Sequence, residues 1–317
     1  MRGRSVLWLA AVAALCLGLG TFRTATADEP PAAALAGAES AAVAAPAVAG
    51  AEEEQGLPQS AVPIGHVGGL ALTNSMFVSW LIGLGFVAFA WTATRNMKRV
   101  PSGAQNLLEW AVESLYGFLE GIIGAHLTKR TFWLLATIFL FILTANWFGL
   151  IPGVGTIGWG RQTAHGFIVD RPLLRGANAD LNLTLAMALT FFGCWIVWAL
   201  QENGVRGIVK ELFGAKGDTA GVMKVLMVAV FFAAGCLEII SILFRPVSLS
   251  FRLYGNIFAG EVMLDTMSRM VPGLGWLLPI PFYFMELLVG LVQALVFMLL
   301  CAVFTMLICQ HEEAAGH

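Results

Sequence analysis

The chain has 317 residues, of which 58% are hydrophobic and only 12% are charged, with 18 basic residues against 20 acidic ones. Soluble domains carry about 25% charged residues, so this composition cannot cover a surface that faces water. It excludes a disordered chain, a collagen and a disulfide-rich scaffold as descriptions of the whole protein, and the net charge of −2 offers no basic field for nucleic acid. The composition predicts a multi-pass membrane protein.

The first 27 residues have the three parts of a secretory signal peptide. Arg2 and Arg4 form the basic start, an apolar run covers residues 6–19, and Ala-Thr-Ala at 25–27 is the expected cleavage site. A short first transmembrane helix is the alternative. Residues 28–69 are rich in Ala, Pro and Glu over most of their length and cannot bury enough apolar surface to fold. We expect them to form a disordered arm outside the cytoplasm.

Five stretches are long and apolar enough to cross a bilayer, which takes about 20 residues. They are residues 76–93, 131–150, 181–200, 222–269 and 275–309. As one helix, at about 1.5 Å per residue, the fourth stretch would be more than twice as long as the roughly 30 Å hydrocarbon core is thick. It must therefore be strongly tilted, run partly along the membrane, or fold back near Pro246.

An amphipathic helix is predicted between the first two spans. Residues 102–105, Ser-Gly-Ala-Gln, indicate a capping box at its start. Apolar side chains then recur every three or four residues, which is typical of a helix on the membrane surface and equally of a soluble helix packed on a partner. The apolar face is Leu108, Val112, Leu115, Leu119 and Ile122, and the polar face is Asn106, Glu109, Glu113 and Glu120.

Basic residues predict the orientation. With the mature N-terminus outside, five crossings place the C-terminus and its tail, residues 311–317, in the cytoplasm. Nine basic residues then lie in inside loops and four in outside loops, which agrees with the positive-inside rule. Folding back near Pro246 would give six crossings, and the same counts exclude that alternative only weakly.

The last two apolar stretches contain polar and charged residues, which the hydropathy of a membrane span does not explain. They recur at three- and four-residue intervals, so they fall on one helical stripe. An ionisable group is expensive inside a membrane and marks an ion path or a partner's counter-charge; the alternative is a set of ion pairs that only holds helices together. The residues are Glu238, Ser241, Arg245, Ser248, Arg252, Asn256, Glu261 and Asp265 in the fourth stretch, and Glu286, Gly290 and Gln293 in the fifth.

Counting residues from a turn near Pro272 gives relative depths in the membrane. Arg252 and Gln293 fall at the same depth, near the middle. Glu261 and Glu286 share a depth nearer the outside, and another carboxylate lies toward the cytoplasm. A fixed cation between carboxylates suits a proton path that is interrupted by a positive charge.

Residues 245–261, RPVSLSFRLYGNIFAGE, closely resemble the signature of subunit a of F-type ATP synthases. Residues 146–153, NWFGLIPG, are similar to the end of that family's second span, and residues 179–184, ADLNLT, to the start of its third. Residues 98–105 resemble the approach to its interfacial helix. The resemblance covers about residues 70–310, the expected membrane domain, and leaves out the leader and the arm.

The resemblance implies an all-α polytopic membrane protein with five transmembrane helices and one interfacial amphipathic helix. Its last two helices would be long, tilted and packed as a hairpin against a rotor ring of c subunits. The chain would be a stator subunit with two offset half-channels that load and unload the ring carboxylates with protons, and it would make no covalent bond itself. Further partners would be b-type peripheral stalk subunits and, indirectly, the F1 sector, in a bacterial inner membrane.

Matching positions then imply roles for single residues. Arg252 would be the essential cation that faces the ring carboxylate. The outer half-channel would contain Asn256, Glu261, Glu286 and Gln293, the cytoplasmic half-channel Glu238, Ser241 and Ser248, and supporting residues would be Arg245 and Asp265. Glu286 departs from several bacterial relatives, which have histidine there. Since two close carboxylates repel each other, one of Glu261 and Glu286 is expected to hold a proton, and the sequence leaves open which one.

Other classes of function remain as alternatives. A secondary ion-coupled transporter could use the same intramembrane charges, although no internal repeat is visible. A haem protein needs axial histidines inside helices, and the five histidines lie outside the predicted spans or at their ends. No GxxxxGK[ST] loop occurs, so nucleotide chemistry would belong to another subunit. No cofactor and no metal are expected.

Overall fold

The computed structural model describes residues 62–67, 70–151, 153–154, 157–163, 166–213, 222–271 and 274–309. The leader (1–27), most of the arm (28–69) and the tail (311–317) lie outside these residues. Five of the described helices are long and apolar enough to cross a membrane, as predicted. They are α2 (Asn74–Thr94), α3 (Ala104–Gly149), α4 (Leu181–Phe213), α5 (Val222–Met270) and α6 (Ile280–Cys309).

Two small antiparallel hairpins add strands that the all-α prediction lacks. One pairs β1 (Pro63–Val67) with β2 (Leu70–Thr73), and the other pairs β3 (Gly158–Thr163) with β4 (Gly166–Pro172). The prediction of disorder over residues 28–69 is therefore wrong for β1. The reason is a local closure: Asn74 N–H donates to the Val62 carbonyl at 3.1 Å, and Val62 N–H donates to Asn74 Oδ1 at 3.2 Å.

Glycines break two of the helices. At Gly124 in α3 the backbone has φ 79° and ψ 160°, and at Gly204 in α4 it has φ 63° and ψ 168°. Only glycine adopts such positive φ angles without strain, so each glycine allows the chain to turn and begin a new helical direction. The predicted amphipathic helix and the second span are thus directly joined at Gly124.

The helix that precedes Gly124 differs from the prediction at its start. The capping box is wrong, because the cap residue is Gly103 and no side chain bonds the first turn. Gln105 instead turns back to Lys98, where it accepts from the backbone N–H at 3.0 Å and donates to the carbonyl at 2.9 Å. This pair of bonds ties the loop after α2 to the start of α3.

Packing of this first half of α3 agrees with the predicted apolar face at Leu119, whereas Val112 of that face is 38% exposed. Leu119 is fully buried in the same cluster as Val78 of α2. Tyr116 meets Phe132 edge to face across the break, with ring centroids 5.2 Å apart. Glu120, on the predicted polar face, is exposed.

Helix α5 is continuous over 49 residues although it contains Pro246. Folding back near this proline is therefore wrong. Pro246 is buried beside Phe191, Phe192 and Trp195 of α4, and this aromatic packing supports the helix where a proline removes one backbone hydrogen bond. At about 1.5 Å per residue, α5 is roughly 74 Å long.

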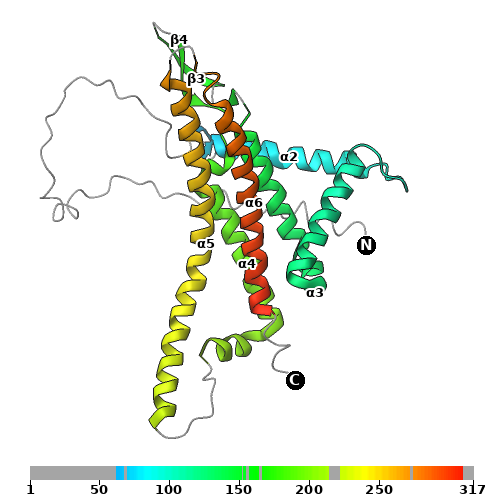
Figure 1. Ribbon diagram of the computed structural model, residues 1–317, viewed down its shortest axis with the longest axis vertical. Helices are drawn as coiled ribbons and strands as arrows, with labels where there is room; N and C mark the ends of the chain where they lie inside the picture. Colours follow the sequence, from blue (N-terminus) through cyan, green and yellow to red (C-terminus); the bar gives the residue numbers. More distant parts are fainter. Residues whose placement is uncertain are drawn as a thin grey trace, which may run out of the picture.

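The helices cross one another at different inclinations (Figure 1). Helices α5 and α6 run antiparallel and are joined by a short turn, while α5 packs most extensively on α4 and α6 on α3. Helix α2 runs crosswise to both. A hydrophobic core at these crossings includes Leu135, Ile142, Leu253 and Met298, all at most 1% exposed.

Candidate functional site

Polar side chains of α5 line a recess beside α6. Ser241, Ser248 and Arg252 line it together, as the three- and four-residue spacing predicts. Leu300 and Phe304 of α6 close the other side, and the recess has a volume of about 300 Å³. Such a space holds several water molecules, since one water occupies about 30 Å³ in the liquid.

Two charged groups of the stripe neutralise each other. Arg245 Nη2 donates to Glu238 Oε1 at 2.9 Å, and the side chains are 20% and 50% exposed. The Arg245 guanidinium also lies over the rings of Phe304, at 4.7 Å, and Trp195, at 5.9 Å. Arg245 of α5 therefore packs against both α4 and α6.

Arg252 lies in a different environment. Its side chain is exposed at the recess, and within the described part of the chain its guanidinium makes no hydrogen bond or ion pair. Asn256, one turn later on α5, is exposed, and Gln293 on α6 is half-buried. No hydrogen bond joins either of these two side chains to another described residue.

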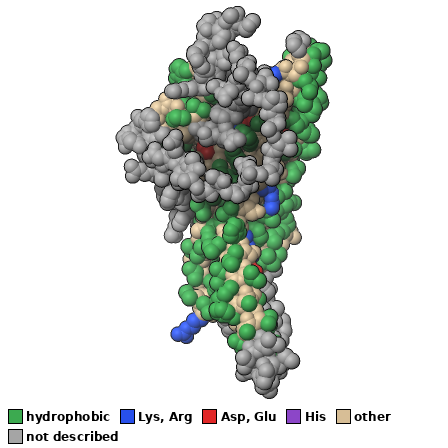
Figure 2. Space-filling view, turned by 90° about the vertical axis from the view of Figure 1, so that its left-hand side faces the viewer, with side chains coloured by type: hydrophobic (Ala, Val, Ile, Leu, Met, Phe, Trp, Pro, Cys, Tyr) green, Lys and Arg blue, Asp and Glu red, His purple; other side chains and the backbone are tan. Residues whose placement is uncertain are grey.

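The surface around Arg252 is strongly apolar. Figure 2 views the molecule from the side on which α5 lies, and hydrophobic side chains predominate in the lower part of this view, with few charged groups between them. Exposed large side chains along α5 include Val228, Val230, Phe232, Leu237, Ile240, Leu243, Phe244, Phe251 and Val262. Arg252 is therefore a cation on a hydrophobic face, and no described residue pairs with its charge.

A second polar cluster lies near the other end of α5 and contains both predicted outer carboxylates. Glu261 and Glu286 are close enough to repel each other electrostatically. Glu286 is only 7% exposed, and its Oε1 has no hydrogen-bond partner among the described residues. The carboxyl group lies against Gly260, where an added Cβ would collide with it.

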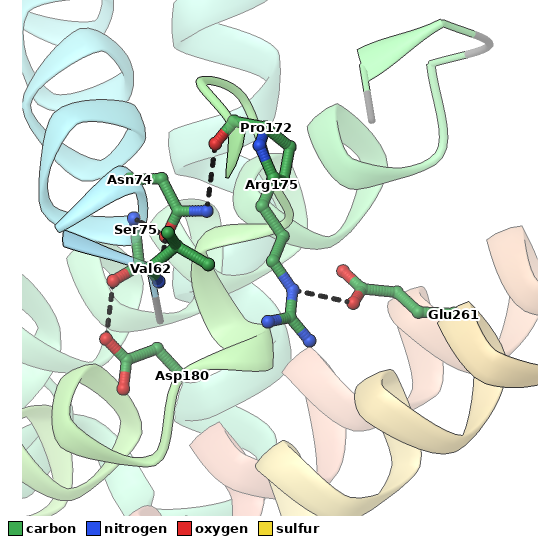
Figure 3. A network of polar contacts seen from close by, with 7 residues as sticks. All are labelled: Val62, Asn74, Ser75, Pro172, Arg175, Asp180 and Glu261. Atoms are coloured by element: carbon green, nitrogen blue, oxygen red, sulfur yellow. Dashed lines mark hydrogen bonds and ion pairs between the residues drawn. The ribbon is translucent and has the colours of Figure 1, made fainter. Parts of the chain in front are cut away.

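Arg175 joins this cluster from the segment between β4 and η2 (Ala177–Ala179). Its Nε donates to Glu261 Oε2 at 3.1 Å, and the two side chains are 5% and 18% exposed (Figure 3). The neighbouring Gly176 hydrogen-bonds Glu261 through its backbone, and a Cβ there would stand 2.6 Å from Glu261 Oε1. The Arg175 guanidinium also lies over the Phe258 ring at 5.8 Å.

Sequence reasoning missed Arg175 as a site residue because it lies outside the apolar spans and was counted only among the loop charges. A signal was present in the sequence: Arg175 shortly precedes the ADLNLT segment, one of the matching motifs. Asp265, predicted as a supporting residue, pairs with Arg269 at 3.0 Å at the exposed end of α5.

Buried amides hold the helices around the carboxylates. Asn146 Nδ2 donates to the Gly290 carbonyl of α6 at 2.9 Å, and Asn178 Nδ2 donates to Asn146 Oδ1 at 2.7 Å. Gly290 allows this approach, since a Cβ there would lie 3.1 Å from Asn146 Cβ. The bonds therefore connect α3, η2 and α6.

Helix α2 is attached to the same region (Figure 3). Asn74 Nδ2 donates to the Pro172 carbonyl at 3.2 Å, and the Ser75 hydroxyl donates to Asp180. These contacts fix the loop that carries Arg175. Among the described residues, no group of three or more His, Cys, Asp or Glu side chains could hold a metal ion.

Comparison with known proteins agrees with this architecture. The model of the family described as ATP synthase A chain matches residues 76–306. The chain belongs to this family. ATP synthase subunit a of Moorella thermoacetica is 32% identical over 239 residues, which are 75% of the present chain and 92% of the relative. Subunit a of Gloeobacter violaceus is 32% identical over 72% of this chain and 80% of the relative. Subunit a 1 of Pelobacter propionicus is 32% identical over 73% and 85%.

Family membership and five membrane-spanning helices make this chain a multi-pass membrane component of an ATP synthase. The matched residues include the recess, Arg252 and both carboxylates, but neither the leader nor the arm. The site described above therefore lies within the region that the family model matches.

Proposed function

We propose that this chain is the proton-conducting stator subunit of an F-type ATP synthase and couples proton movement to the rotation of a c-subunit ring. Arg252 carries the proposal: it is a cation on an apolar helix face, beside a recess that two serines help to line, with no partner among the described residues. A charge in this setting is expensive unless a second protein supplies the counter-charge. A carboxylate on a neighbouring ring is such a counter-charge.

Two half-channels meet at Arg252 in this proposal. The recess lined by Ser241 and Ser248 supports a cytoplasmic half-channel, with Glu238 near its mouth. Glu261 and Glu286 support an outer half-channel, which Asn256 and Gln293 continue toward Arg252. Asp265 stands at the outer end of α5, where it pairs with Arg269.

The charge of Arg252 explains how the ring would move in one direction. A ring carboxylate that faces lipid is neutral, because a bare charge there is costly. Beside Arg252 it loses its proton to one half-channel and later regains one from the other. Arg252 itself keeps its proton, since a guanidinium does not deprotonate in proteins, so protons cannot pass straight between the half-channels.

The geometry of the helices supports a tilted hairpin against the ring. Helix α2 has 21 residues, about 31 Å at 1.5 Å per residue, which matches a roughly 30 Å hydrocarbon core if α2 is upright. Helices α5 and α6 run crosswise to α2 and would then be strongly inclined (Figure 1). Within this frame, the helix Ala104–Ile123 that ends before Gly124 would lie along the membrane surface.

The remaining assignments follow from membership in the complex and from the sequence. The subunit is not itself catalytic, and ATP chemistry belongs to the F1 sector, which it reaches indirectly; b-type stalk subunits hold it in place. We place it in a bacterial inner membrane, with a cleaved signal peptide, the mature N-terminus outside and the C-terminus inside. Residues 70–310 are the membrane domain.

Affinity purification tests the proposal. A tagged chain extracted in mild detergent should bring with it a ring of small two-helix subunits and a soluble ATPase. The reconstituted complex should pump protons on addition of ATP, without a requirement for sodium and with full collapse by a protonophore. A chain that purifies alone and transports a solute without ATP would instead support a secondary transporter.

A further inference from the structure

The α2–α3 corner, residues 91–110, gathers basic side chains. It contains three basic residues and one acidic residue, a net charge of +2 in a chain whose net charge is −2. Arg95, Lys98 and Arg99 are all exposed, and none of them forms an ion pair within the residues that the structure describes. The acidic residue, Glu109, is half-buried and already accepts a side-chain hydrogen bond at 2.8 Å. The corner therefore carries an excess of positive charge.

The backbone that carries these charges is held in place. Gln105 is buried, accepts from the Lys98 backbone N–H at 3.0 Å and donates to the Lys98 carbonyl at 2.9 Å. The Arg95 guanidinium lies over the Trp91 ring, 5.1 Å from its centre, and the Arg95 N–H donates to the Trp91 carbonyl at 2.9 Å. A site that is ordered before its ligand arrives loses less entropy on binding. The loop therefore presents its basic side chains in a fixed arrangement.

Large apolar side chains accompany the charges and are not covered by the rest of the chain. Trp91 in the last turn of α2 is 60% exposed. On the first half of α3, Leu107, Trp110 and Phe118 are exposed, and their spacing of three and eight residues places them on one side of the helix. The corner lies to the side of the α5–α6 pair, away from the recess (Figure 1). It is thus a separate surface that combines cations with tryptophans.

The headgroup of an acidic phospholipid matches this combination. A guanidinium presents paired N–H groups to phosphate oxygens. Tryptophan is enriched at the depth of the headgroups, where one end of its ring system is in the apolar layer and the other is wet. An acidic segment of another protein would match the charge alone. The exposed tryptophans beside the end of a membrane span favour the lipid.

We propose that the α2–α3 corner binds the headgroup of an acidic phospholipid. Phosphate oxygens of the lipid accept hydrogen bonds from Arg95, Lys98 and Arg99, while Trp91 and Trp110 lie beside its glycerol and upper acyl chains. This inference goes beyond the proposed function and takes from it only the orientation, which puts the lipid in the cytoplasmic leaflet. The bound lipid anchors the corner and keeps the first half of α3 against the membrane surface.

Photo-crosslinking in the whole purified complex tests the site. The complex is stripped of lipid in detergent and titrated with phosphatidylglycerol that carries a photoreactive group near its phosphate, and labelled peptides are identified by mass spectrometry. Label should appear within residues 91–110. Unlabelled phosphatidylglycerol should displace it at a concentration at least about tenfold lower than phosphatidylcholine does, because each basic residue favours acidic lipid by about fivefold, equivalent to about 1 kcal/mol.

Removing charge from the corner should weaken the labelling. Lys98→Gln/Arg99→Gln should raise the lipid concentration for half-maximal labelling at least about tenfold, for the same reason. Lys98→Arg/Arg99→Lys keeps both charges and should bind like the wild type. Lys129→Gln/Arg206→Gln removes two charges from exposed residues outside the corner and is the control for net charge, so its labelling should stay near that of the wild type.

Four results would each overturn the proposal. The first is a wild-type complex without label in residues 91–110, and this result needs no variant, so it decides the question even if a variant fails to assemble. The second is equal displacement by the two lipids. The third is unchanged labelling in Lys98→Gln/Arg99→Gln, or a loss that Lys129→Gln/Arg206→Gln shows equally. The fourth is a corner variant that loses another subunit while its labelling is unchanged, which would make the occupant a protein.

Discussion

Arg252→Ala should remove coupled transport without removing the subunit from the complex. The Arg252 side chain is exposed and makes no hydrogen bond or ion pair within the residues that the structure describes. Substitutions at such positions change the free energy of unfolding by about 0.5 kcal/mol or less. The amount of assembled complex, measured by native gel electrophoresis, should therefore stay near that of the wild type.

The functional loss should be much larger. A carboxylate about 4 Å from a guanidinium is stabilised by about 4 kcal/mol in an environment with an effective dielectric constant of about 20. This corresponds to about a thousandfold in the ionisation equilibrium of the ring carboxylate. Pumping and ATP synthesis should be undetectable, whereas passive proton flow through vesicles stripped of the soluble ATPase should persist or rise, because the barrier between the half-channels is gone.

Arg252→Lys should fail as well, since a lysine is a point charge on a flexible stem and can lose its proton when desolvated. An Arg252→Ala complex that assembles and synthesises ATP at a near-normal rate would refute the mechanism. A variant that does not assemble at all would assign Arg252 a structural role instead.

Three further predictions concern other parts of the chain. Mature protein should begin at Asp28, and N-terminal sequencing that starts at Met1 would contradict the leader assignment. Arg245→Ala should reduce pumping only about two- to fivefold, because the lost ion pair with Glu238 is partly exposed and such pairs contribute about 1 kcal/mol or less; complete loss of pumping would show that Arg245 acts directly on the ion. Gly260→Ala should displace the Glu286 carboxyl and destabilise the complex by about 1–3 kcal/mol in thermal unfolding, the usual cost of overpacking. Gly193→Ala, where a Cβ meets nothing within 4 Å, is its control, and equal melting temperatures for these two variants would contradict the contact.

Hydropathy predicted the five spans because bilayer thickness sets a length that the sequence displays directly. The helical spacing likewise placed Ser241, Ser248 and Arg252 on one face, and these three residues line a common recess. Periodicity is a local property of a helix, and it holds whatever the helix packs against. For the same reason it did not distinguish Arg245, which is paired with Glu238, from Arg252, which pairs with no described residue.

Contacts between residues far apart in the sequence could not be predicted from local sequence patterns. The pairing of Arg175 with Glu261 joins residues 86 positions apart, and neither neighbourhood in the sequence indicates the other. The break at Gly124 depends on the backbone turning between two packed helices, and glycine alone does not predict where a helix turns. Pro246 shows the converse, since buried aromatic side chains around it maintain a helix that a proline would otherwise weaken.

The charges of α5 also set conditions for how the chain enters the membrane during synthesis. Arg or Asp near the centre of a helix opposes insertion by about 2.5–3.5 kcal/mol per residue, and α5 carries several charged groups along its length. Arg175, which neutralises Glu261, precedes α5 in the chain, whereas Glu286 follows it. The nascent helix can therefore meet its buried counter-ion on a segment that has already emerged, before α6 exists. Biogenesis of α5 should depend on the first half of the protein, and a chain that begins at α5 should insert poorly.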